Sequence, residues 1–109
     1  MIHAARLRRS RDIAAVRAEG RAVRRSTFVA RVRAHDANGT RVAVVAPRSV
    51  GSAVMRNRAR RRVREAFRRE LASTQPAADF FVTVRPEAVS APHATIVADA
   101  ASVLREAAR

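Results

Sequence analysis

The chain has 109 residues, 48% of them hydrophobic, and its 23 basic and 9 acidic side chains give a net charge of +14. This length and composition favour a globular protein with a modest core, which we expect to be a single domain over residues 1–109. The absence of cysteine excludes disulfides, thiol catalysis and cysteine zinc sites and favours a cytoplasmic protein. No apolar run approaches the length of a membrane span, so no membrane partner is expected.

The N-terminal residues predict a basic segment followed by a short helix. Residues 1–9 are expected to form a flexible basic N-terminus. Ser10 can cap a helix and Gly20 can end it, so we place the first helix between them. Ile13 and Val16 are expected on its narrow inner face.

Two strands are predicted after this helix. Apolar and other residues alternate over about residues 22–34, as in a half-buried strand, and the β-branched run at residues 41–46 predicts a second strand. Asn38 and Gly39 lie between the two runs and form a strong turn signal. We therefore expect these two strands to pair as an antiparallel hairpin.

The second half of the chain predicts a helix, a strand and a helix. Ser52 can cap a long helix over about residues 53–72. The run FFVTV at residues 80–84 predicts a buried strand, and Pro92 can start a last helix that ends near residue 107. The order is helix, strand, strand, helix, strand, helix (αββαβα). A helix between strands predicts a crossover unit in a small mixed central sheet, which defines an α+β fold.

The long helix combines an apolar stripe with an arginine-rich remainder. At about 100° per residue, six apolar residues fall on one side: Met55, Ala59, Val63, Ala66, Phe67 and Leu71. Residues 56–69 hold eight arginines and one glutamate, and an ordinary solvated face would mix the two signs. Such a helix needs a polyanion, for which nucleic acid is the obvious candidate. Asn57 is equally well interpreted as a surface residue or as a hydrogen-bonding contact to RNA or to the water of a bound metal.

The other polar residues give no catalytic or metal-binding pattern. The three histidines lack the spacing of metal ligands, and no Ser/His/Asp or Cys/His set is present. Asp12 and Asp79 flank predicted elements, where caps are the simplest interpretation. The run RLRRSR at residues 6–11 is a second basic cluster, and a solvated chain end and a functional cluster remain equally open interpretations. We expect no catalytic residue, no metal ligand and no protein-bound cofactor.

Four stretches, in order along the chain, resemble the protein component of bacterial ribonuclease P. The family's signature resembles VGSAVMRNRARRRVREAFR (residues 50–68), and its opening helix resembles RLRRSRDIAAVRAEGR (residues 6–21). The strand and loop before the signature resemble RVAVVAPRSVG (residues 41–51), and a later strand resembles DFFVTVRP (residues 79–86). The resemblance implies a sandwich like the second domain of ribosomal protein S5, with a left-handed βαβ crossover, whereas general rules alone favour a right-handed one.

The resemblance also implies a function and its residues. The family's protein binds the catalytic RNA of ribonuclease P and the 5′ leader of precursor tRNA. The catalytic RNA removes the leader, with Mg²⁺ ions bound by the catalytic RNA and not by the protein. The residues expected to bind RNA are Arg56, Asn57, Arg58, Arg60, Arg61, Arg62, Arg64 and Arg68. The residues expected to line a leader-binding cleft between the first helix and the sheet are Ile13, Arg17, Phe28 and Arg31.

The chain departs from the family pattern near this cleft. Ile13, Arg17 and Arg31 stand where the family often has aromatic residues, and Pro47-Arg48 replaces paired lysines. The cleft is therefore expected to stack bases less and to bind phosphate more. The alternative function is that of a structural ribosomal RNA-binding or ribosome-assembly protein, and a stand-alone nuclease is a third interpretation. Whether the protein has protein partners is left open.

Overall fold

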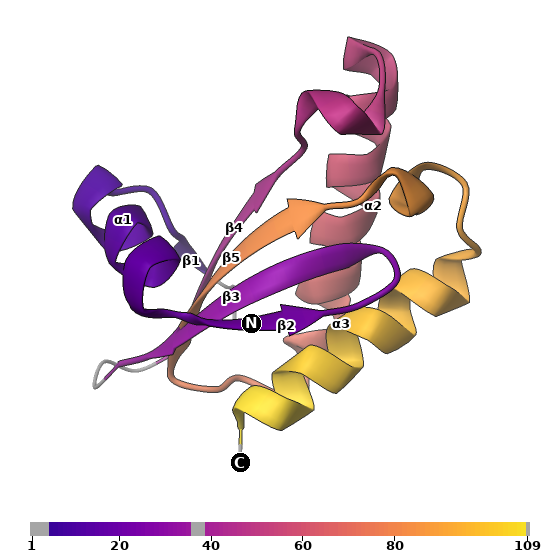
Figure 1. Cartoon of the computed structure of the whole chain (residues 1–109). Coiled ribbons are helices and arrows are strands. Elements are labelled where there is room, and N and C mark those ends of the chain that lie inside the picture. Colours follow the sequence, from indigo (N-terminus) through magenta and orange to yellow (C-terminus); the bar gives the residue numbers. More distant parts are fainter. Residues whose placement is uncertain (1–4, 36–38, 109) are drawn as a thin grey trace.

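The fold is built on a five-stranded mixed sheet with the strand order β1-β4-β5-β3-β2 (Figure 1). A computed structural model describes residues 5–35 and 39–108. The strands are β1 (Ala5–Arg6), β2 (Arg21–Arg24), β3 (Phe28–Ala34), β4 (Thr40–Val45) and β5 (Ala78–Val84). The helices are α1 (Ser10–Glu19), α2 (Ala53–Glu70) and α3 (His93–Ala107), with short 3-10 helices η1 (Arg48–Val50) and η2 (Pro86–Val89). The predicted α+β class is confirmed.

The helices cover opposite faces of the sheet. The ring of Phe80 on β5 lies 6.1 Å from the ring of Phe67 on α2, whereas Arg17 of α1 lies over the ring of Phe81, 5.4 Å from its centroid. Neighbouring residues of a strand point to opposite faces, so α1 and α2 lie on opposite sides of the sheet. Helix α3 packs beside α2 (Figure 1). The main core therefore lies between the sheet and the pair formed by α2 and α3.

The apolar stripe of α2 lies at the centre of this core. Five of the six predicted stripe residues are buried: Ala59, Val63, Ala66, Phe67 and Leu71. The ring of Phe67 packs 5.3 Å from that of Phe28, which is fully buried. The prediction for Met55 is wrong, because its side chain is 42% exposed. Met55 lies in the first turn of α2, which extends past the ends of the strands (Figure 1).

The predicted hairpin between β3 and β4 is wrong, because β5 lies between them. Strand β5 pairs antiparallel with β3 and parallel with β4 along nearly its whole length. This strand carries the apolar run FFVTV, which is best buried in the middle of the sheet, where both of its edges are paired. Gly39 does take the left-handed conformation that the turn signal requires, with φ of 85°, but the chain crosses one strand instead of forming a two-residue turn.

The predicted strand at residues 22–34 is two strands joined by a turn. Strands β2 and β3 pair antiparallel, and the N–H of Arg25 donates to the carbonyl of Phe28 across the turn. The carboxylate of Asp99 on α3 accepts hydrogen bonds from the hydroxyl of Ser26 and from both the N–H and the hydroxyl of Thr27. The turn is thus fixed by a side chain more than seventy residues away, which no local pattern indicates.

The expected flexible N-terminus is wrong for residues 5–7. Ala5 and Arg6 form β1, which pairs parallel with β4, and the side chain of Leu7 is buried. The backbone N–H of Leu7 donates to the carbonyl of Val42 at 3.1 Å. A buried leucine and this edge pairing hold the segment on the sheet. Residues 1–4 lie outside the described residues.

Helix α1 begins one residue earlier than its predicted cap implies. Ser10 is the first helical residue, and Arg9 precedes it without a side-chain cap. Gly20 ends the helix as predicted, and its N–H donates to the carbonyl of Val16 at 2.8 Å. Its φ of −71° suits any residue, so the requirement for glycine is steric. A Cβ at this position would lie 2.3 Å from the carbonyl oxygen of Val16.

The other predicted elements are confirmed within a few residues. Ser52 caps α2, and its hydroxyl accepts a hydrogen bond from the N–H of Met55. Helix α2 connects the parallel strands β4 and β5, which confirms the crossover unit. Its left-handed sense stays a prediction. Within residues 5–35 and 39–108, no helix has the length and apolar character needed to cross a membrane.

Candidate nucleic-acid interface

The sequence of α2 places its basic side chains on two flanks of the buried stripe. At about 100° per residue, the flank toward β4 carries a group that we call the arginine surface: Arg56, Asn57, Arg60, Arg61, Arg64 and Arg68. The flank toward η2 carries Arg58, Arg62 and Arg69. The structure thus divides the predicted RNA-binding residues into two sets with different surroundings.

The arginine surface contains few groups that offset its charge. Arg68 donates two hydrogen bonds to the carboxylate of Glu65, at 3.0 and 2.5 Å, and this pairing lowers the pKa of Glu65. Arg60 donates to the side-chain oxygen of Asn57, so Asn57 orients an arginine on this surface. No carboxylate in the described part of the chain lies within ion-pair distance of Arg56, Arg61 or Arg64. These guanidinium groups can therefore bind an external anion without breaking an internal pair.

Arg62 forms hydrogen bonds within the fold. Its guanidinium donates to three backbone carbonyls in η2 and just after it: those of Ala88 at 2.9 Å, Val89 at 3.0 Å and Ala91 at 2.5 Å. Arg58, one turn earlier, donates to the carbonyl of Val89 at 3.1 Å. Arg62 is half-buried, whereas Arg58 is exposed. The guanidinium of Arg62 is thus used within the fold, so its expected RNA contact stays a prediction that competes with these hydrogen bonds, while Arg58 is exposed to solvent.

Three of the four predicted cleft residues lie around α1, and one does not. Arg17 lies over the ring of Phe81, within the range of a cation–π interaction. Arg31 donates to the carbonyl of Gly20 at 3.2 Å, and Ile13 is half-buried on α1. Phe28 is fully buried on the opposite face, where it packs against Phe67 on α2. Its assignment to the cleft is wrong because strand alternation places it with Ala30, inside the core.

Sequence reasoning missed Phe81 as a residue of this face. The run FFVTV was expected to be buried throughout, but only Phe80, Val82 and Val84 are buried, whereas Phe81 is half-buried. Thr83 has the same parity as Phe81, and this polar residue was the available signal that one side of the strand is not core. Phe81 is thus the aromatic ring of β5 on the α1 face.

A buried ion pair fixes α1 against the sheet. Arg41 on β4 donates to both carboxylate oxygens of Asp79, at 2.7 and 2.6 Å, and to Asp12 of α1 at 3.2 Å. Asp79 is 1% exposed, and its hydrogen bonds raise the pKa of Arg41. Asp12 and Asp79 are therefore ion-pair partners and not caps. A fork of this kind holds its partners in one orientation, so it positions Arg17 on α1 relative to Phe81.

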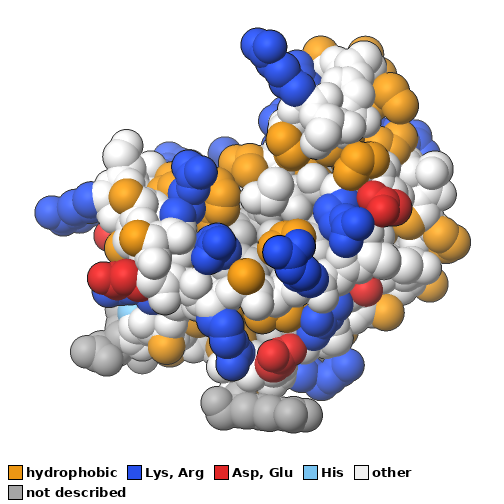
Figure 2. Space-filling view, in the orientation of Figure 1, with side chains coloured by type: hydrophobic (Ala, Val, Ile, Leu, Met, Phe, Trp, Pro, Cys, Tyr) orange, Lys and Arg blue, Asp and Glu red, His pale blue; other side chains and the backbone are white. Residues whose placement is uncertain are grey.

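Basic side chains outnumber acidic ones on the face shown in Figure 2. Several acidic residues are paired with arginines that join elements, such as Glu106 of α3 with Arg25 at 2.9 Å and Glu19 with Arg33 at 2.8 Å. The described residues contain no group of three or more side chains that could hold a metal ion. The arrangement can bind polyanions over a wide area, through many guanidinium groups and one half-buried ring.

The fold and this surface define a small, strongly basic α+β protein whose arginines are concentrated on one long helix. The family model for Ribonuclease P matches residues 1–108. The chain belongs to the ribonuclease P protein family. It is 39% identical over 108 residues to a relative from Chloroflexus aggregans named "Ribonuclease P protein component", and the match covers 98% of this chain and 80% of the relative.

Solved structures of the family have the same fold. The ribonuclease P protein of Thermotoga maritima superposes with a TM-score of 0.80 and 28% identity, covering 93% of this chain and 96% of that one. That of Staphylococcus aureus superposes with a TM-score of 0.76 and 23% identity, covering 97% and 96%. The resemblance of the four sequence stretches is thereby confirmed over nearly the whole chain.

Proposed function

We propose that this protein is the RNA-binding subunit of ribonuclease P and assists a catalytic RNA in removing the 5′ leader from precursor tRNA. The observation that carries the proposal is the arginine surface of α2, a set of guanidinium groups that few carboxylates offset, in a chain of this family. The catalytic step and its Mg²⁺ are assigned to the RNA, as the family resemblance implies. The protein supplies affinity and position.

The arginine surface would bind the catalytic RNA through its phosphates. Guanidinium groups form two-pronged hydrogen bonds with phosphate oxygens, and each neutralised phosphate releases counterions. If each of the five arginines of this surface neutralised one phosphate, the logarithm of the binding constant would fall with the logarithm of the salt concentration with a slope of about −4.5, at roughly −0.9 per phosphate. Asn57 would add a neutral hydrogen bond and hold Arg60 in place.

The α1 face would bind the leader of the precursor. Arg17 and Arg31 supply charge, and Phe81 supplies a ring on which a base can stack once Arg17 moves aside. Ile13 adds apolar contact from α1. The charge of Arg17 and Arg31 is the reason to expect phosphate binding to dominate over stacking here.

The test is reconstitution with the catalytic RNA of ribonuclease P from the same organism. Cleavage of precursor tRNA is measured at a low Mg²⁺ concentration with RNA alone, protein alone and both. We expect rapid cleavage only with both, and Arg61→Gln should raise the protein concentration needed. Cleavage by protein alone would identify a nuclease. No effect of the protein, together with its copurification with ribosomal RNA, would favour the ribosomal alternative.

A further inference from the structure

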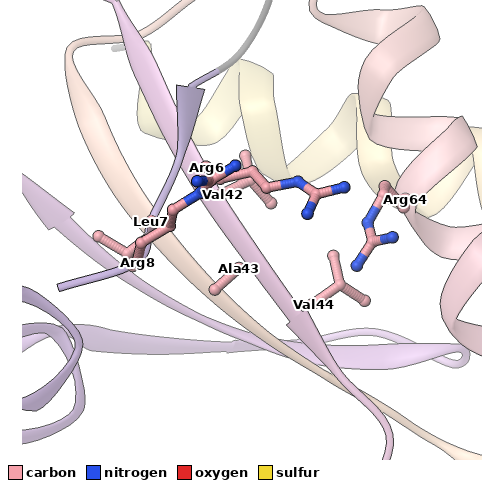
Figure 3. Close-up of a pocket in the computed structure, with 7 residues that line it drawn as sticks. All are labelled: Arg6, Leu7, Arg8, Val42, Ala43, Val44 and Arg64. Atoms are coloured by element: carbon pink, nitrogen blue, oxygen red, sulfur yellow. The ribbon is translucent and has the colours of Figure 1, made fainter. Parts of the chain in front are cut away.

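A basic pocket lies between β1, β4 and α2, beside the arginine surface. It has a volume of about 360 Å³, and its walls are residues 6–8, residues 42–44 and Arg64. In Figure 3 the side chain of Arg6 extends toward Arg64, and both guanidinium groups lie in this space. One water molecule occupies about 30 Å³ in the liquid, so the pocket has room for a phosphate group.

The register of β1 explains why these two arginines meet. Arg6 pairs with Val42 in the parallel ladder. Directly paired residues share a face of the sheet, so Arg6 projects toward the side that α2 covers. Arg64 lies on the flank of α2 that faces β4. Leu7 is buried and its N–H is bonded to Val42, so Arg6 starts from a fixed backbone position.

The two arginines repel each other, and nothing in the described pocket offsets their charge. No carboxylate is among the described residues that line it, whereas Arg41 elsewhere has Asp79 at 2.6 Å. Partial burial, followed by the charges of Arg6 and Arg60, lowers the pKa of Arg64. Two guanidinium groups held together without a counterion form a site that an anion would complete.

We propose that Arg6 and Arg64 together bind one backbone phosphate of the catalytic RNA, which makes the N-terminal strand β1 part of the RNA interface. The proposal rests on the proposed function, because it extends the arginine surface across β1. We choose RNA as the ligand because the pocket is continuous with the arginine surface: Arg64 belongs to both and lies one turn from Arg60. One arginine of the N-terminal basic cluster, Arg6, would thereby have a role in RNA binding.

The test measures binding of the catalytic RNA as a function of salt concentration for the wild type, Arg6→Gln, Arg64→Gln and the double variant. Arg105→Gln on α3 is the matched control, because it removes one charge outside the interface. We expect Arg6→Gln to weaken binding several-fold more than Arg105→Gln. The double variant should reduce the salt slope by about 0.9, the value for one phosphate. A reduction of about 1.8, or equal effects of Arg6→Gln and Arg105→Gln, would overturn the shared site.

A second arm separates RNA phosphate from free phosphate. Inorganic phosphate is titrated into the protein–RNA complex against chloride at matched ionic strength. Because the pocket is proposed to bind a phosphate group, we expect inorganic phosphate to release the RNA more effectively than chloride, and Arg6→Gln to weaken both RNA binding and this excess effect. Competition by phosphate that Arg6→Gln abolishes without changing RNA affinity would instead identify a free-anion site. Wild-type protein is tested in parallel for stimulation of precursor tRNA cleavage. If the wild type stimulates cleavage and Arg6→Gln binds the RNA as tightly as the wild type, the shared phosphate site is refuted but the proposed function is not. If the wild type does not stimulate cleavage, the proposed function itself is refuted.

Discussion

Arg61 and Arg62 are adjacent in the sequence, and we predict that they act in different ways. Arg61→Gln should weaken RNA binding and leave the free energy of unfolding nearly unchanged, since its side chain is exposed. Arg62→Gln should destabilise the fold, because Arg62 donates to three carbonyls of the η2 segment. The two variants have the same charge, so self-repulsion in the +14 chain is relieved equally in both.

The size of the Arg62 effect follows from the carbonyls left behind. Ala88 is fully buried, while Val89 and Ala91 are half-buried and can be hydrated after the change. A buried acceptor without a partner costs about 1–3 kcal/mol, so we expect a loss of about 2 kcal/mol. For a domain of about 100 residues this lowers Tm by roughly 8 °C or more.

Thermal unfolding followed by circular dichroism, in phosphate buffer, measures the difference between the two variants. The salt slope for RNA binding is measured on both at a temperature where each is folded. Equal Tm values would refute the structural role of Arg62. A slope reduced by about 1 in Arg62→Gln, as for a lost phosphate contact, would restore Arg62 to the RNA interface.

Three further predictions address the core, the cleft and the charge. Phe67→Ala should lower the free energy of unfolding, measured with denaturant, by about 3–5 kcal/mol, because the ring of Phe67 packs on Phe28 and Phe80. Unchanged stability would contradict the burial of this face of α2. Arg17→Gln and Arg31→Gln should each lower the ratio of precursor to mature tRNA affinity of the holoenzyme, and an unchanged ratio in both would exclude them as leader contacts. Phosphate should raise Tm in dilute buffer more than sodium chloride does at matched ionic strength, since phosphate binds to guanidinium groups of the folded state in addition to screening charge. A high Tm that does not change when phosphate is added would contradict this prediction.

Local periodicity was enough to predict α2 and its buried side. The 3.6-residue repeat that contains Val63 and Phe67 is a property of the segment itself, and Ser52 marks its start. The stripe failed only at Met55, because burial there depends on where the strands end. Periodicity therefore predicts which side of a helix is apolar, but not how much of that side is covered.

Strand order depends on contacts that local patterns do not contain. The turn signal at Gly39 correctly predicts a change of direction, yet the pairing of β3 with β5 is decided by a strand that begins at Ala78. The role of Arg62 likewise depends on carbonyls at residues 88–91. Phe28 is a different case, since its alternation with Ala30 already placed it in the core. The family resemblance wrongly implied that Phe28 lines the leader-binding cleft.

The distribution of acidic side chains indicates the proposed interface more specifically than the total charge does. Asp79 and Asp12 join Arg41 and hold α1 on the sheet, and Glu106 joins Arg25 and holds α3 against the segment between β2 and β3. Each of these carboxylates forms an ion pair that connects two elements of the fold, and the pair fixes the position of one element relative to the other. Among the described residues, the one carboxylate that pairs with the arginine surface belongs to Glu65, which lies on the outer side of α2 and bonds Arg68.

The two flanks of α2 therefore balance their charge by different means. On the η2 side, carbonyl dipoles accept the hydrogen bonds of Arg62, so the folded chain satisfies that guanidinium internally. On the β4 side, the described carboxylates leave Arg56, Arg61 and Arg64 without an ion-pair partner. Repulsion along that side opposes folding, and a bound polyanion removes it. If the proposed function holds, binding and stability are coupled on the β4 flank, and substitutions there should change both in the presence of RNA.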